Sequence, residues 1–142
     1  MAKYESTLAP ALRQWVEMLI EYYPENKRRL ELLKNSMIPS AIPKYGPQAG
    51  GGDSEARPTE EVAVKIVSDR YLLNLEMTVG AISSVYDQLG ELDRELLRLR
   101  FWDGNLTPDG IALRLNVSRT TFYIHLNSIL VEVARRIGYI DL

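Results

Sequence analysis

The segment between Thr107 and Arg119 constrains the fold more than any other part of the chain, because it holds two helix starts separated by a turn. Thr107 can cap a helix whose first residue is Pro108, where a missing N–H costs nothing. Asn116 tolerates the left-handed conformation that ends helices. Ser118 is a strong cap for a second helix that begins at Arg119. The segment therefore predicts two short helices joined by a tight turn, which is the requirement of a helix-turn-helix.

The residues between these signals separate the helix-turn-helix from its alternative, an ordinary helical hairpin. Ile111, Ala112 and Leu115 share one face of the first helix. Ala112 is small enough to let a second helix cross closely, and Val117 can plug the corner. Cap, small residue, turn residue, plug and second cap arrive together, which favours the helix-turn-helix.

The chain before this motif is predicted to be helical on both sides of one proline. Apolar residues recur at helical spacing between Ser6 and Tyr23, and again between Glu25 and Met37. Pro24 separates the two stretches because proline lacks the N–H that a helix interior needs. We therefore expect a helical pair in residues 1–38.

Residues 39–58 form a predicted flexible linker. The stretch is rich in residues that interrupt regular structure, namely Pro39, Pro43, Pro47, Gly50, Gly51, Gly52 and Pro58. About twenty residues is also longer than an ordinary ordered connection. A folded loop over a binding site is the alternative.

A long helix is predicted from Thr59 to Leu89. Its interior glycine, Gly80, weakens it by about 1 kcal/mol relative to alanine and marks a kink or a close crossing. Its second half carries an a/d seam, in which apolar residues alternate at three and four. Two interpretations stay open: the seam packs on the helix-turn-helix of its own chain, or it forms a homodimer interface through Leu72, Leu75, Val79, Ile82 and Tyr86.

Two more helices complete the predicted fold. The first runs from Glu91 to Trp102 and leads into the helix-turn-helix, and the last runs from Arg119 to about Ile137, where Gly138 stops it. No strand pattern of any length appears. We predict an all-α protein with an N-terminal helical region (1–38), the linker (39–58), and a long helix followed by a helix-turn-helix domain (59–142).

Composition narrows the classes of function. The chain of 142 residues has no cysteine, which excludes disulfides, thiolate metal sites and a cysteine nucleophile. No apolar run approaches the ~20 residues of a membrane span, and the N-terminus lacks the pattern of a signal peptide. These features favour a cytoplasmic protein without a membrane partner.

The residues give no sign of an enzyme. No Ser/His/Asp arrangement, phosphate-binding glycine pattern or paired carboxylates in an apolar setting occur, so we expect no catalytic residues, no cofactor and no metal site. The lone histidine, His125, is more typical of a packing residue than of a ligand. Trp15 and Trp102 are predicted core residues.

The second helix of a helix-turn-helix lies in the major groove, and its N-terminal residues meet the base edges. Phe122 is expected to point to the core, so the opposite face faces the groove. Arg119 can bond a guanine edge twice, and threonine hydroxyls suit phosphates or thymine methyls. The candidate DNA-binding residues are Thr107, Ser118, Arg119, Thr120, Thr121, Tyr123 and Asn127.

Three stretches carry a family resemblance, namely Leu92–Phe101, Ile111–Ala112 and Val117–Tyr123. Together they resemble region 4 of bacterial sigma factors, and more closely the phage transcriptional regulators of the RinA and ArpU type. The N-terminal helical part, around Tyr22–Lys27, is similar to these regulators more loosely. The resemblance implies a prophage-encoded activator of late genes in a bacterial host cell.

The first hypothesis is therefore a sequence-specific regulator that binds double-stranded DNA as a homodimer. Residues 90–142 carry seven acidic and seven basic side chains, so one copy is expected to bind DNA weakly. A neutral recognition face also fits the second hypothesis, a protein-interaction module that contacts RNA polymerase or another regulator. A small-terminase-like subunit for DNA packaging is the third.

Overall fold

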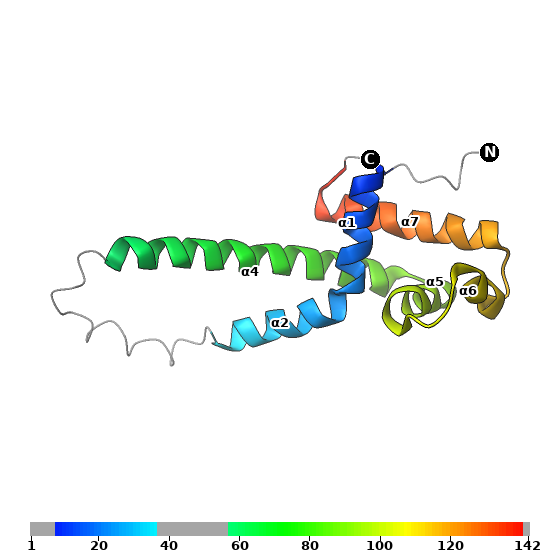
Figure 1. Ribbon diagram of the computed structural model, residues 1–142, viewed down its shortest axis with the longest axis horizontal. Helices are drawn as coiled ribbons and strands as arrows, with labels where there is room; N and C mark the ends of the chain where they lie inside the picture. Colours follow the sequence, from blue (N-terminus) through cyan, green and yellow to red (C-terminus); the bar gives the residue numbers. More distant parts are fainter. Residues whose placement is uncertain (1–7, 37–56, 141–142) are drawn as a thin grey trace. The chain divides into compact units, whose positions relative to one another are not determined.

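The computed structural model describes residues 8–36 and 57–140, with residues 36 and 57–67 described by their backbone only. All regular elements in these ranges are helices, which confirms the all-α prediction. In chain order they are α1 (Pro10–Glu21), α2 (Tyr23–Ser36), α4 (Arg57–Gln88), α5 (Glu91–Leu97), the π-helix η3 (Arg98–Asp103), α6 (Pro108–Leu115) and α7 (Arg119–Ile137) (Figure 1).

The N-terminal helical pair is confirmed, with shifted ends. Helix α1 begins at Pro10 rather than at Ser6, because proline at the first position needs no hydrogen-bond acceptor there. Pro24 lies in the first turn of α2 rather than before it. The predicted linker lies outside the described residues up to residue 56, and α4 begins at Arg57, two residues before the predicted start.

The chain divides into two compact units that differ from the regions expected from the sequence. The first unit holds the residues up to Tyr23 and those from Thr78 onward, and the second holds Pro24–Met77. Helix α1 therefore belongs with the helix-turn-helix. Composition marked the break at the Pro/Gly-rich segment, whereas the packing of α1 depends on contacts between residues far apart in the chain.

In the second unit, α2 and the first part of α4 are bridged by polar side chains. Arg29 donates to the Tyr71 hydroxyl over 3.2 Å, and the Lys34 ammonium lies 3.3 Å from the Glu76 carboxylate. These bridges are exposed and each is worth at most about 1 kcal/mol. The apolar contribution to the stability of this unit comes from its buried side chains, Leu30 and Leu75.

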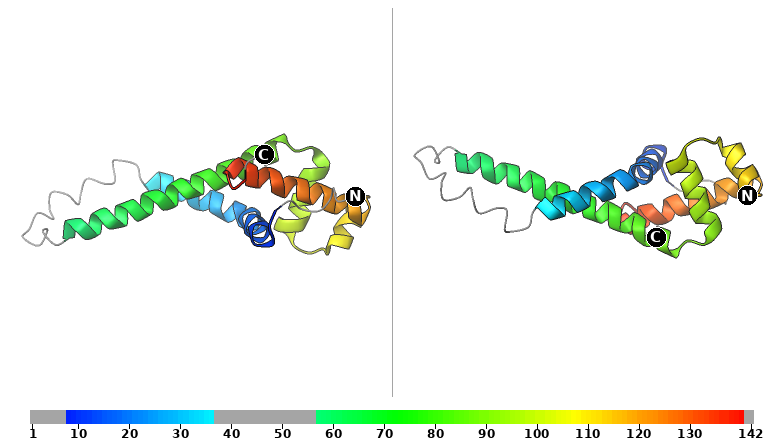
Figure 2. Two further views of the ribbon diagram at one scale, coloured as in Figure 1. Left: turned by 90° about the horizontal axis from the view of Figure 1, so that it is seen from above. Right: turned by 90° about the horizontal axis from the view of Figure 1, so that it is seen from below.

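The first unit encloses the main hydrophobic core. Helices α5, α6 and α7 pack against one another, and α1 packs across α7 and η3 (Figure 2). The largest fully buried side chains come from the four α-helices of this bundle and from the end of α4, namely Val16, Ile20, Val85, Leu96, Leu97, Ile111, Phe122, Leu126, Leu130 and Val133.

The two tryptophans have different environments. Trp102 packs against the core between the rings of Tyr23 and Tyr86, at 5.9 and 5.8 Å between centroids, and its Nε1 donates to the Ile20 carbonyl over 2.8 Å. The prediction for Trp15 is wrong, since its side chain is 43% exposed. Its Nε1 donates to the Tyr139 hydroxyl, and the core face of α1 is formed by its aliphatic residues instead.

The a/d seam of α4 is covered within the chain itself. Leu75, Val79 and Ile82 are buried, and Leu72 is half-buried. Tyr86 is half-buried as well, and it packs between Trp102 and the Arg94 guanidinium. Leu75, Val79 and Ile82 have little apolar area left for a second copy, and the homodimer interpretation of the seam stays a prediction. An a/d pattern in the sequence indicates that one face of a helix is buried, but it does not indicate whether that face packs on the same chain or on a second copy.

The helix predicted from Glu91 to Trp102 is continuous but changes type. It is α-helical to Leu97 and π-helical from Arg98 to Asp103, where Gly104 ends it at φ 69°. The wider turn of a π-helix brings residues five apart together. Arg98 accordingly binds Asp103 over 2.6 Å, and it also pairs with Glu95.

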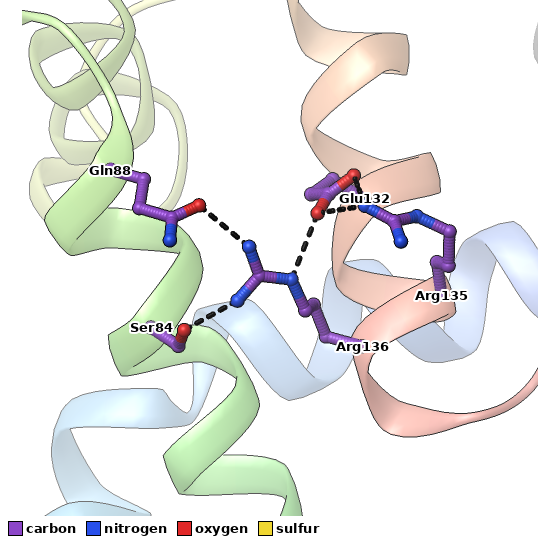
Figure 3. Close-up of polar contacts among 5 residues, drawn as sticks. All are labelled: Ser84, Gln88, Glu132, Arg135 and Arg136. Atoms are coloured by element: carbon purple, nitrogen blue, oxygen red, sulfur yellow. Dashed lines mark hydrogen bonds and ion pairs between the residues drawn. The ribbon is translucent and has the colours of Figure 1, made fainter.

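A polar network fixes the C-terminal end of α7 to the last turns of α4 (Figure 3). The Arg136 guanidinium donates to Glu132 on its own helix over 2.9 Å, to Gln88 over 2.6 Å, and to the Ser84 hydroxyl. Hydrogen bonds from Arg135, followed by those from Arg136, hold the pKa of Glu132 below its ordinary value. Gly138 ends the helix at φ 98°, as predicted.

Candidate nucleic-acid interface

The turn between α6 and α7 has the hydrogen bonds that its sequence predicts. The Thr107 hydroxyl accepts from the Gly110 N–H over 3.1 Å, and the Ser118 hydroxyl accepts from the Thr121 N–H over 3.0 Å. Asn116 takes the left-handed conformation at φ 63°, and the Val117 N–H then reaches the Ala112 carbonyl at 3.0 Å. Both caps and the turn residue are confirmed.

Packing behind the turn fixes which face of α7 is outward. Ile111 and Ala112 are buried under α7, and Phe122 and Leu126 are buried one and two turns into it. Arg119 lies three residues before Phe122 and shares its side of the helix, but it stands at the first position of α7, where its side chain and that of Thr120 are exposed. The start of α7 is therefore an exposed ridge on a buried support.

The predicted DNA-binding residues fall into two groups. Arg119 and Thr120 are exposed, and Tyr123 is half-buried beside the Phe122 ring. The hydroxyls of Thr107 and Ser118 are exposed but act as helix caps, and Thr121 bonds to Ser118 through both its N–H and its hydroxyl. The side chains best placed to contact a ligand are those of Arg119, Thr120 and Tyr123.

Asn127 is not part of this surface, which corrects the prediction. Only 8% of the residue is exposed, and its Oδ1 accepts a hydrogen bond from Arg13 of α1. Helix α1 packs across α7 and covers this position. A local pattern could not reveal the cover, because Arg13 lies 114 residues earlier in the chain.

Arg119 is exposed and yet oriented by two neighbours. Its side chain is 67% exposed, its Nε lies 3.4 Å from Oδ1 of Asp109, and its Cζ lies 5.9 Å from the Tyr123 ring centroid. Asp109 stands in the first turn of α6, and the tight turn brings that position beside the start of α7. Asp109 is not among the residues predicted from the sequence. The available signal was an acidic residue in the first turn of one helix and a cationic residue at the start of the next.

Other side chains of the helix-turn-helix are exposed as well. Arg114 of α6 is exposed and adds a second positive charge to the motif, beside that of Arg119. Leu113 is 81% exposed, which is the highest exposure among the large apolar residues described, and Ile124 on α7 is 39% exposed. The motif therefore presents two arginines, one aspartate and two aliphatic side chains to solvent.

His125 is half-buried and connects α7 to the start of α5. Its Nδ1 lies 2.6 Å from Oδ1 of Asp93, which is a structural contact between two helices of the bundle. Among the described residues, no group of histidine, cysteine, aspartate and glutamate side chains is arranged to hold a metal ion.

Comparison with protein-family models, curated proteins and solved structures found no match for this chain. In the part of the chain that the structure describes, no helix combines the length and apolar character needed to cross a membrane. The resemblance to phage regulators and to sigma region 4 stays a prediction.

Proposed function

We propose that this chain is a DNA-binding regulator of transcription that reads double-stranded DNA with the first turns of α7. The observation that carries the proposal is the exposed start of α7, held by two capped helix ends on a fully buried support. A rigid, outward helix N-terminus is the part that a helix-turn-helix inserts into the major groove. The resemblance to the RinA and ArpU type supports a role in phage gene activation.

The exposed side chains fit distinct parts of a duplex. The Arg119 fork suits the O6 and N7 acceptors of guanine, and Thr120 suits a thymine methyl or a phosphate. The Tyr123 hydroxyl can donate to a phosphate. The first turn of α6, after Thr107, presents backbone N–H groups of the kind that bind phosphate at helix starts.

The charges on this face predict modest affinity for DNA of arbitrary sequence. Arg114 and Arg119 oppose Asp109, so few phosphates can be neutralised by one copy of the motif. Each neutralised phosphate contributes about 0.9 to the slope of log affinity against log salt. We expect a slope well below that of strongly basic repressors, and a correspondingly large share of the affinity from base contacts.

The test is a fluorescence-anisotropy titration of the full chain. Duplexes from upstream of the neighbouring genes are compared with random duplexes at two salt concentrations. Arg119→Ala should weaken binding to the preferred duplex by about 1–3 kcal/mol, or roughly 5- to 150-fold.

The matched control is Arg28→Ala, which removes an exposed arginine from the second unit. It should leave binding unchanged. An equal loss of affinity in both variants would show that binding depends only on the overall charge of the protein. If the folded protein preferred no duplex over random DNA, the proposal would be overturned.

A protein-interaction module is the second candidate, and exposed apolar side chains favour it. Leu113 and Ile124 are exposed on the helix-turn-helix itself, where a partner protein could cover them. RNA polymerase is the partner that a transcription regulator would contact. If Leu113 contacts the polymerase, Leu113→Ser should reduce transcription from a reconstituted promoter without changing duplex affinity. If the motif contacts DNA alone, the substitution should leave transcription unchanged.

A further inference from the structure

The neighbours of Arg119 suggest how the proposed site selects its DNA. The guanidinium has two neighbours, the Asp109 carboxylate and the Tyr123 ring. Both contacts come from positions fixed by the motif, since Asp109 lies just inside the Thr107 cap and Tyr123 lies one turn after Arg119. A long, 67% exposed side chain is thereby restricted in its orientation.

We propose that Asp109 is the specificity-determining residue of this interface, and that it holds Arg119 for bidentate recognition of a guanine. The inference rests on the proposed DNA-binding function. Because the ion pair uses Nε, the Nη1–Nη2 edge of the fork remains for a planar pair of acceptors such as guanine O6 and N7. The Tyr123 ring, whose centroid lies 5.9 Å from Cζ, restricts the fork further, so less orientational entropy is lost on binding.

The carboxylate also acts against the wrong contacts. A phosphate near Arg119 lies near Asp109 as well, and like charges at short range repel. Guanine presents its acceptors without a net charge, so the same carboxylate opposes it far less. Asp109 therefore lowers affinity for any duplex backbone while leaving the guanine contact, which is specificity by exclusion of alternatives.

An exposed ion pair contributes little to the stability of the fold. A role of Asp109 in DNA selection can therefore be tested separately from a role in stability. The Asp109 side chain is 69% exposed, and it does not take part in the helix cap, in which the Thr107 hydroxyl accepts from the Gly110 N–H. Asp109→Asn should therefore leave the unfolding midpoint nearly unchanged. A change in DNA selection by a variant of unchanged stability reports on the interface.

The experiment begins with 30-bp duplexes selected by the wild-type full chain from a random pool. Asp109→Asn should bind random duplexes about 3- to 10-fold more tightly and lose about 10-fold of its preference for the selected duplex. Its salt slope should rise by about 0.9, which corresponds to one new phosphate contact.

The control for charge is Asp103→Asn, which breaks a different exposed ion pair, with Arg98, in the same unit. It changes the net charge equally and should leave the preference and the slope unchanged. The control for the base is 7-deazaguanine at each guanine of the selected duplex, which removes the N7 acceptor. At one position it should weaken binding by the wild type and leave binding by Arg119→Ala unaffected, because alanine has no donor for N7.

The outcomes separate the two proposals. If no sequence is enriched from the pool, the proposed function fails. If a sequence is enriched but both asparagine variants behave alike, or no guanine depends on Arg119, DNA binding stands and the role of Asp109 is overturned.

Discussion

Replacing Gly80 by alanine should stabilise the first unit, although glycines within helices are often kept for close contacts. A Cβ built at Gly80 meets no atom within 4 Å, and the residue lies inside α4 with helix on both sides. Alanine therefore adds helix propensity without a clash, which is worth about 0.5–1 kcal/mol. With a urea m-value of about 2 kcal/mol per M, the midpoint should rise by about 0.2–0.5 M.

Tryptophan fluorescence is a suitable probe, because Trp15 and Trp102 both belong to the unit that contains Gly80. The matched control is Gly138→Ala. Its Cβ also meets nothing within 4 Å, but its φ of 98° is strained for any side chain, so it should destabilise by about 1 kcal/mol or more. Destabilisation by Gly80→Ala that grows with protein concentration would refute the reasoning, since another copy would then occupy that face of α4.

Three other changes test the packing of α7. Phe122→Ala, at a side chain with no exposed area, should cost about 3–5 kcal/mol in urea unfolding; a loss below about 1 kcal/mol would contradict the packing of the motif. Arg13→Ala leaves the buried Asn127 amide without its α1 partner and should cost about 1–3 kcal/mol, and a double-mutant cycle with Asn127→Ala should show coupling. Because the pKa of Glu132 is depressed, its contribution is complete above the ordinary value of 4.5 and is lost as pH falls through the lower folded value. Glu132→Gln should flatten the stability profile in that acid range, and an unchanged profile would show that the network contributes nothing there.

The local part of the interface could be predicted because its chemistry is local. The side chain of a Thr or Ser cap accepts a hydrogen bond from the N–H three residues later, and an Asn in the left-handed conformation ends a helix. The roles of Thr107, Asn116 and Ser118 therefore follow from their own residue types and near neighbours. Burial of Phe122 follows from helical spacing alone. These features need no knowledge of the rest of the chain.

The missed features depend on three-dimensional contacts that local sequence patterns do not encode. Asn127 has suitable chemistry for reading adenine, but α1 covers it through Arg13. Trp15 is apolar and lies on a helix, yet the core face of α1 is the neighbouring stripe that includes Val16 and Ile20. The pairing of Asp109 with Arg119 likewise needs the turn geometry, which spacing alone does not supply.

The cover over Asn127 has a consequence for the proposed function. If the chain reads DNA as proposed, base reading is limited to the first turn of α7, where Arg119 and Thr120 would supply two base contacts worth about 1–3 kcal/mol each. Selecting one site among about a million requires about 8 kcal/mol, which two contacts do not reach. The proposed function therefore requires a second motif on the DNA, and the buried residues of the α4 seam, Leu75, Val79 and Ile82, offer little apolar area for joining two copies.

Two copies reading neighbouring half-sites would leave a defined trace in the selected duplexes. The short preferred sequence should appear twice, with centres about 10 bp apart or a multiple of that, since both motifs must face the same side of the helix. Duplexes shortened to one half-site should lose most of the preference. Full preference for a single half-site would mean instead that side chains beyond the first turn of α7 read the DNA, which contradicts the role of α1 as its cover.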